Sequence, residues 1–403
     1  MSWSETAPLA GTRVLDLTRV VAGPFGTMLL GDLGADVVKI EEPQKGDEAR
    51  GFGPPFLGGE SAYFLSVNRN KRSCAVDLKS KAGRDLVLKL AGVADVVVEN
   101  FRPGTLERLG LGFETLSRLN PRLILCAVSG FGRDGPEAGR PGYDLIVQGE
   151  SGVMDVTGEA EGPPTKVGTS IADLVSGMYA AQAVLSALLR RERTGRGGRV
   201  DIAMLDAMAS LLTMNAGIYF ATGKAPKRRG NAHPTITPYE TFEASDGWIN
   251  VGCASEKFWR AFCETIGAAA LLDDPRFRIN ADRVTNRPAL RAALEPIFRR
   301  ETRRHWLDRL TAAGIPCGEI KTVAEVCTAP QLTGRGMIQS MPHKAAGTVR
   351  AVASALRFDD APPAQPTPPP MLGEHTAAVL SEWLGLEAAD AAALAAAGAF
   401  GTT

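Results

Sequence analysis

The sequence contains 403 residues, enough for two domains or for one large domain with an insertion. Apolar residues make up 44% of it, which is enough for a sizeable core. The 45 Lys and Arg residues balance the 45 Asp and Glu residues. This neutrality argues against a general nucleic-acid-binding or anionic-membrane surface, so we expect no nucleic acid among the partners.

Six cysteines are spread along the chain without a CxxC pair, and there are four histidines. We therefore expect neither a metal site nor a disulfide scaffold, and we expect a cytoplasmic protein with reduced thiols. No basic segment followed by an apolar run opens the chain, so no signal peptide is predicted. The longest apolar stretch, within residues 171–194, is interpreted as too short and too rich in small residues to span a membrane.

Strands and helices alternate through the first 130 or so residues, which predicts a parallel sheet. Buried strands are expected within residues 11–18, 35–43, 68–80, 95–101 and 121–132, and helices within 20–34, 81–94 and 101–110. Thr18, Asn100 and Ser129 lie where three of these strands end. Because ligands gather at the carboxyl ends of parallel strands, these residues are candidates for a site, although Asn and Ser are also ordinary turn residues.

The first strand-to-helix turn contains the sequence Gly-Pro-Phe-Gly at residues 23–26. This is not the GxGxxG pattern of dinucleotide-binding proteins, but Glu41 and Glu42 follow at about the distance of a ribose-binding acid. A nicotinamide-dependent oxidoreductase is therefore one alternative, with weak support.

Residues 171–194 have the apolar spacing of a helix, and Asp173 lies near its start. The expected apolar face consists of Ile171, Leu174, Val175, Met178, Leu185, Leu188 and Leu189. The other side carries Asp173 with Ser176, Gly177 and Ala180, so another group could lie close against it. Helix amides there favour an ionised carboxylate, which makes Asp173 a candidate nucleophile. The alternative is an ordinary helix start, with Ser170 and Asp173 in an S-x-x-D capping pattern.

The second half of the chain indicates a smaller α+β domain. We expect residues 1–200 to form the N-terminal part of a large α/β domain, 201–224 a linker helix, and 225–325 the small domain. Residues 326–403 would form a second linker and the return to the large domain. Within the small domain, residues 239–253 have the pattern of a β-hairpin. The basic stretch at residues 224–229 is either a solvated charge run or a feature that favours a dicarboxylate.

A set of motifs runs in order along almost the whole chain. They are LAGTRVLDLTRVVAGPF, LGADVVKIEEP, NRNKRS with VDLK, VVVENFRPGTLERLG, SGFGRDGP, DLVSGMYAA, RTGRGGRVDIAMLDA, GIPCG and LGEHT. Together they resemble the class III CoA-transferases, the family of formyl-CoA transferase, carnitine CoA-transferase and the α-methylacyl-CoA racemases. The resemblance implies a Rossmann-like large domain, a smaller domain, and a homodimer in which two ring-shaped chains interlock.

The resemblance also implies roles for particular residues. The nucleophilic aspartate of the family falls on Asp173. The loops that contact CoA fall on Val21, Ala22, Val76, Asp77, Leu78, Lys79, Asn100, Phe101, Arg102, Arg108, Gly142 and Tyr143. CoA would be a substrate, as an acyl-CoA together with a small carboxylic acid, and no bound prosthetic group is implied. Basic side chains at strand ends suit the phosphates of CoA.

Three positions depart from the family pattern. Racemase members have a His at the position of Tyr143, and a Tyr lacks the near-neutral pKa that two-base proton transfer needs, which disfavours racemisation. The glycine-rich loop of formyl-CoA transferase is replaced by residues 230–242, and Glu42 replaces a basic CoA contact. The leading expectation is a CoA-transferase. A 2-methylacyl-CoA racemase and a non-catalytic acyl-CoA-binding protein remain alternatives.

Overall fold

The computed structural model describes residues 6–359 and 364–401. Contacts divide the chain into two compact units, which are described separately. The large unit consists of residues 1–153, 166–217 and 330–403, and the small unit of residues 154–165 and 218–329. The chain thus leaves the large unit twice, for the short segment 154–165 and for residues 218–329, and returns each time. The segment 201–224 is not a single linker helix, because it contains the end of a strand and two helices.

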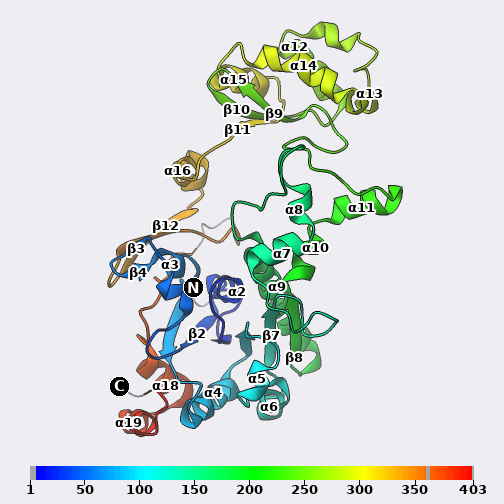
Figure 1. The fold of residues 1–403 in the computed structure, drawn as a ribbon. Helices are drawn as coiled ribbons and strands as arrows, with labels where there is room; N and C mark the ends of the chain where they lie inside the picture. The colour runs from blue at the N-terminus through cyan, green and yellow to red at the C-terminus, as the bar shows by residue number, and fades with distance from the viewer. Residues whose placement is uncertain (1–5, 360–363, 402–403) are drawn as a thin grey trace. The chain divides into compact units, whose positions relative to one another are not determined.

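The large unit is built on a six-stranded sheet in the order β5-β2-β1-β6-β7-β8. Strands β2, β7 and β8 are labelled in Figure 1. All neighbouring strands in the sheet are parallel. The strands are β1 (Arg13–Asp16), β2 (Asp36–Glu41), β5 (Lys71–Ala75), β6 (Val96–Glu99), β7 (Ile124–Ser129) and β8 (Gly198–Ala203). The α/β prediction is confirmed. The central strands are buried on both faces, which explains their continuous Val, Ile and Leu runs.

Helices cover both faces of the sheet. One face is covered by α2 (Ala22–Asp32), α7 (Asp144–Glu150), α9 (Ile171–Thr194) and α10 (Met204–Ser210). The other is covered by α4 (Lys81–Val93), α5 (Thr105–Arg108), α6 (Phe113–Leu119), α18 (Thr376–Leu384) and α19 (Ala388–Ala396). The remaining helices of this unit are α3 (Ala62–Val67) and α17 (Pro330–Gly334); α8 (Val153–Val156) and α11 (Thr213–Thr222) lie at the boundaries between the units.

Helices α2 and α9 pack with their backbones close together. A Cβ atom placed on Gly177 would lie 2.6 Å from the carbonyl oxygen of Ala22, and one on Gly26 would lie 2.9 Å from the carbonyl oxygen of Gly177. The small-residue side of α9, including Ser176 and Ala180, is therefore buried against α2. The sequence correctly indicates a close approach on this side.

The expected apolar face of α9 is only partly in the core. Leu188 is buried, but 53% of Met178 and 58% of Leu189 are exposed in the single chain. By length and composition, the 24-residue helix α9 is also long enough to cross a membrane, contrary to the expectation. This is weak evidence for a span, because half of its apolar window is buried and it packs on α2 as a core helix does.

Several elements of the large unit are absent from the sequence prediction. The loop after β2 forms a 3-10 helix η1 (Glu48–Gly51), a short hairpin of β3 (Phe56–Leu57) and β4 (Glu60–Ser61), and α3. A second hairpin pairs β12 (Ile338–His343) with β13 (Gly347–Val352). Helix α5 spans only Thr105–Arg108 of the helix expected within residues 101–110.

The small unit contains the predicted hairpin of β9 (Tyr239–Ala244) and β10 (Gly247–Gly252), to which β11 (Cys317–Glu319) adds a third strand. Its helices are α12 (Glu256–Thr265), η2 (Ala269–Leu272), α13 (Asn280–Thr285), α14 (Arg287–Phe298), α15 (Arg303–Ala312) and α16 (Val323–Thr328). Phe298 stacks on Phe242 and lies against Trp306 at the centre of a separate core. This core is consistent with the predicted α+β character.

Candidate active site

A small cavity lies at the carboxyl ends of β1, β2, β5 and β6. Its volume is about 50 Å³, and it is lined by Leu17, Arg19, Ile40, Glu41, Glu42, Val76, Asp77, Leu78, Lys79 and Phe101. Five of the residues predicted to contact CoA, Val76 to Lys79 and Phe101, are therefore brought together here. This is the edge at which open parallel sheets hold ligands.

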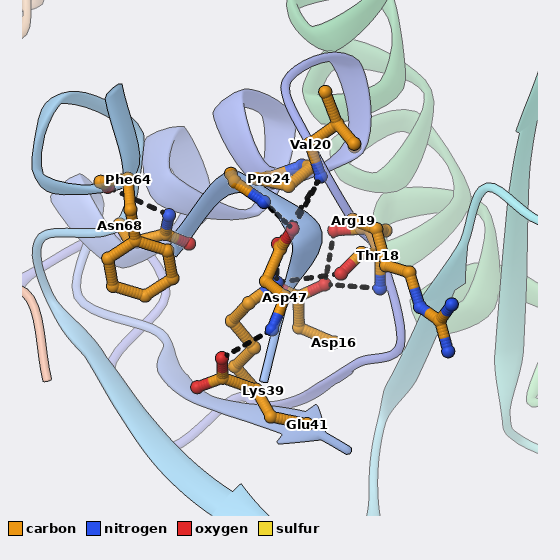
Figure 2. A network of polar contacts seen from close by, with 12 residues as sticks. Asp16, Thr18, Arg19, Val20, Pro24, Lys39, Glu41, Asp47, Phe64 and Asn68 are labelled. Carbon is orange, nitrogen blue, oxygen red and sulfur yellow. Dashed lines mark hydrogen bonds and ion pairs between the residues drawn. The ribbon is translucent and has the colours of Figure 1, made fainter. Parts of the chain in front are cut away.

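Beside this cavity is a buried network of charged side chains, shown in Figure 2. The Nζ atom of Lys39 lies 2.8 Å from an Asp47 carboxylate oxygen, and both side chains are buried. The Nζ atom of Lys71 lies 3.0 Å from Asp16 in the same way. Burial opposes the charge on Asp16, but the two lysines outweigh it and lower the pKa of Asp16 to about 2.

The network fixes the backbone of the segment between β1 and α2. Lys39 donates to the carbonyl oxygen of Thr18 at 2.6 Å, and the Val20 amide donates to Asp47 at 3.0 Å. Val20 adopts φ 67°, a left-handed conformation that is costly for a β-branched residue. The buried Asp47 carboxylate therefore stabilises an unfavourable backbone conformation directly before Val21 and Ala22. Both of these predicted contact residues are buried in the single chain.

Asn100 follows the end of β6, and its side-chain amide makes two hydrogen bonds with the backbone of Arg19. Its Oδ1 accepts from the Arg19 amide at 2.8 Å, and its Nδ2 donates to the Arg19 carbonyl at 2.8 Å. Arg102 and Arg108 are exposed nearby, and Arg108 donates to Thr105 Oγ1. Asn100 therefore connects two strand ends, whereas the two arginines are available to a ligand.

The predicted residues Gly142 and Tyr143 lie against the loop after β7. A Cβ atom on Gly130 would lie 2.7 Å from the Cα atom of Gly142, so this approach requires glycine on both segments. Tyr143 directly precedes α7 and is 71% exposed. Ser129, the third strand-end residue, has a buried hydroxyl oxygen without a hydrogen-bond partner in the described part of the chain.

Asp173 lies in the first turn of α9, as predicted. The S-x-x-D capping alternative is wrong, because the Ser170 side chain makes no capping hydrogen bond. Asp144 caps the helix instead, accepting from the Ala172 amide at 2.9 Å. Asp144 also accepts from Gln148, which in turn accepts from the Val167 amide. Helix α7 thus positions the start of α9.

The environment of Asp173 differs from the sequence expectation. Burial, and then the negative charge of Asp144, raise the pKa of Asp173 to about 7. Helix amides were expected to stabilise the ionised form of Asp173, but burial and the charge of Asp144 outweigh them. Asp144 itself accepts the hydrogen bond of the Ala172 amide. Asp173 is a poorly solvated carboxyl group that loses its proton near neutral pH.

Tyr63 is a neighbour of Asp173 that sequence reasoning missed. It lies on α3 and packs edge-on against Phe52, beside a hollow of about 490 Å³. Burial raises its pKa, a hydrogen bond with Ser170 opposes this, and the charge of Asp173 raises it further. Asp144 and Tyr63 were missed because no motif marks them, and Arg19 was missed although it lies in the first motif, LAGTRVLDLTRVVAGPF. Only the fold brings α3, α7 and the β1–α2 segment to these places.

The basic residues of the stretch 224–229 have different environments in the structure. Arg228 donates to the carbonyl oxygen of Asp155 and pairs with its carboxylate at 3.1 Å. Arg229 and Asn231 instead line a cavity of about 460 Å³ together with Trp248. The stretch is therefore not simply a solvated charge run.

Comparisons with known proteins identify the family. The sequence model of CoA-transferase family III matches residues 9–376. The chain belongs to CoA-transferase family III.

Relatives and solved structures place the chain more closely within the family. It is 41% identical over 377 residues to succinyl-CoA:glutarate CoA-transferase of Mus musculus, covering 94% of this chain and 86% of the relative. It is 43% identical over 385 residues to acetyl-CoA:oxalate CoA-transferase of Acetobacter aceti, covering 94% and 97%. A CAIB/BAIF family protein from Brucella suis has the same fold, with a TM-score of 0.83 and 42% identity over 94% of this chain and 99% of that one.

Family membership makes this protein a CoA-transferase that acts on CoA thioesters. The cavity at the strand ends is lined by two cationic side chains, Arg19 and Lys79, together with the acids Glu41, Glu42 and Asp77. The individual contacts with CoA, and the role of Asp173, remain predictions.

Proposed function

We propose that this protein transfers CoA from an acyl-CoA donor to a free carboxylic acid, with Asp173 as the nucleophile. The observation that carries the proposal is the half-buried Asp173 carboxyl at the start of α9, whose pKa burial raises to about 7. A carboxylate that is poorly solvated is more nucleophilic than one in water, and transfer through an anhydride also requires that water be kept away.

The proposed reaction has two symmetrical halves. An oxygen of Asp173 attacks the donor thioester carbon, the C–S bond breaks, and CoA thiolate leaves a mixed anhydride. The thiolate then attacks the Asp173 carbonyl carbon, releasing the donor acid and forming an aspartyl-CoA thioester. The acceptor carboxylate attacks this thioester to give a second anhydride and free thiolate. Attack of the thiolate on the acceptor acyl carbon yields the new acyl-CoA and restores the Asp173 carboxylate.

The favoured substrates are succinyl-CoA as donor and a small dicarboxylic acid as acceptor. Support comes from relatives named for these acids, including succinate–glutarate CoA-transferase of Agrobacterium fabrum, which is 39% identical over 381 residues. The first assay is incubation with succinyl-CoA, acetyl-CoA and a panel of free acids, with new thioesters identified by mass spectrometry.

Isotope transfer tests the nucleophile directly. In the proposed sequence, one oxygen of the acceptor carboxylate remains on Asp173 after the second anhydride is cleaved. Turnover with ¹⁸O-labelled glutarate should therefore make the tryptic peptide with Asp173 heavier by ¹⁸O. Asp173→Ala should lose CoA transfer, while Asp206→Asn, an exposed acid on α10, should transfer and label normally. Rapid transfer without label in this peptide would exclude the anhydride route.

A 2-methylacyl-CoA racemase is the second candidate on the same scaffold. Tyr143 argues against it, because a phenol cannot exchange an α-proton near neutral pH as a histidine can. We expect little deuterium at Cα when a 2-methylacyl-CoA is incubated with the protein in deuterium oxide. Fast labelling with inversion would favour the racemase.

We further propose a cytoplasmic, interlocked homodimer. The support is a chain that leaves and re-enters the large unit, together with the exposed apolar residues Met178 and Leu189 on α9, which a second copy could cover. Two interlocked chains cannot separate without opening one ring, which requires residues 330–403 to detach from the rest of the large unit. Sedimentation should therefore find a dimer even at nanomolar concentration, and a folded monomer on dilution would refute interlocking.

A further inference from the structure

We propose that Arg19 binds a phosphate group of CoA and that Asn100 acts as a positioning residue for Arg19. The proposal rests on the function given above, because it assumes that CoA occupies the cavity at the carboxyl ends of β1, β2, β5 and β6. It is carried by two observations. The backbone around Arg19 is fixed from several sides, and its guanidinium has one acidic neighbour among the described residues, the exposed Glu48 at 3.8 Å.

The backbone of residues 18–20 has almost no freedom. The Thr18 amide donates to Asp16 at 2.8 Å, and the Thr18 carbonyl accepts from Lys39 at 2.6 Å. The Arg19 amide and carbonyl both bond to Asn100, and the Val20 amide bonds to Asp47. Five consecutive polar groups of the backbone are therefore bonded to side chains, at distances of 3.0 Å or less. Such restraint lowers the entropy lost when the segment binds a ligand.

The Arg19 side chain points away from the buried network, as Figure 2 shows. Its guanidinium lies over the ring of Phe101, 5.2 Å from the ring centre, and it lines the cavity. Among the described residues, the acid within ion-pair distance is Glu48, at 3.8 Å and with both side chains well exposed. A pair of this length and exposure is weak, so the guanidinium remains available to an anion.

The acids that share the cavity are already bonded to donors of the protein. Glu41 accepts from Arg50 and Ser73, and Glu42 accepts from the amides of residues 44 and 45. Asp77 accepts from the Lys79 amide. Among the described residues, Lys79 takes part in no ion pair, and Arg19 has only the weak pair with the exposed Glu48. The cavity therefore offers unused cationic donors, which phosphate oxygens match best.

Acyl donors that lack the phosphates of CoA distinguish the loss of a phosphate contact from a general loss of activity. Arg19→Gln should raise KM for succinyl-CoA on the order of tenfold or more, because a charge-assisted hydrogen bond is lost, and should change kcat little. With succinyl-pantetheine, which has no phosphate, Arg19→Gln and the unchanged protein should have the same KM. Lys89→Gln, an exposed lysine on α4 outside the cavity, is the matched control and should behave as the unchanged protein with every donor.

Succinyl-3′-dephospho-CoA identifies the phosphate group. If the penalty of Arg19→Gln disappears with this donor, Arg19 binds the 3′-phosphate; if it remains, Arg19 binds the diphosphate. An equal penalty with succinyl-pantetheine, or none with succinyl-CoA, would refute the contact. Should the protein prove inactive, calorimetry with CoA still decides, because equal CoA affinity of Arg19→Gln and the unchanged protein would refute the proposal independently of the reaction.

A double-mutant cycle tests the role of Asn100. Asn100→Ala should reduce the preference for succinyl-CoA over succinyl-pantetheine, since Arg19 is no longer held in place. In the Arg19→Gln background the same change should leave that preference unaltered. A merely structural role would lower activity with both donors equally in both backgrounds, and that result would overturn the positioning role.

Discussion

The pH dependence of CoA transfer should report the environment of Asp173. The proposed nucleophile must be ionised in order to attack, and burial together with Asp144 raises its pKa to about 7. The ionised fraction is then about 0.1 at pH 6 and about 0.9 at pH 8, whereas a carboxyl group with an ordinary pKa is ionised at both. We expect kcat/KM for succinyl-CoA to rise about tenfold over this range and then to level off.

The same pKa makes a prediction about stability. Because the pKa of Asp173 is raised on folding, the fold favours its neutral form. This stabilisation is present below the ordinary pKa of a carboxyl group and is lost as the pH rises through about 7. Asp173→Asn should therefore stabilise the protein more at pH 8 than at pH 5, as measured by urea unfolding at both values.

Asp144→Asn separates the two causes of the shift. It removes the neighbouring charge but retains an oxygen that can accept from the Ala172 amide. The midpoint of the activity profile should move to lower pH, yet stay above that of an ordinary carboxyl group, because burial is the larger cause. Asp206→Asn should leave the profile unchanged. A flat profile from pH 5 to 8 in the unchanged protein would refute the argument.

Two further changes test the packing that supports the site. Gly177→Ala places a Cβ atom 2.6 Å from a backbone oxygen of α2, so it should lower the free energy of unfolding by about 1–3 kcal/mol. Gly217→Ala, where the added atom meets nothing within 4 Å, should have no such effect, and equal unfolding curves for the two variants would contradict this account. Lys39→Met leaves the buried Asp47 carboxylate unpaired and should cost about 3–5 kcal/mol. Denaturant midpoints close to that of the unchanged protein would show that Lys39 is not needed to hold Asp47.

The parallel sheet could be predicted because the apolar pattern of each strand and helix is contained in a short stretch of sequence. Runs such as Val96–Val98 are apolar throughout because each strand is buried on both faces, and the helices between them have clear apolar spacing. The hairpins β3–β4 and β12–β13 were missed. Their strands are short or partly exposed, so their sequences have no regular apolar alternation.

The candidate site was predictable only in part. Motif order was sufficient to identify the family and to select Asp173 and the CoA-contact residues as candidates, of which Val76 to Lys79 and Phe101 line one cavity. The environment of Asp173 was not predictable, because Asp144 is 29 positions away in the sequence and reaches the helix start only through the packing of α7. Local helix amides suggested a lowered pKa, whereas burial and a second carboxylate raise it.

By itself, the sequence determined the class of fold, the family and the candidate nucleophile, since these depend on local periodicity and on the order of motifs. Only the tertiary structure decided which face of α9 is buried, that Asn100 bonds to the backbone of Arg19, and that Asp173 titrates near neutral pH. These properties depend on burial and on charges contributed by distant segments, and the folded arrangement of the elements sets both.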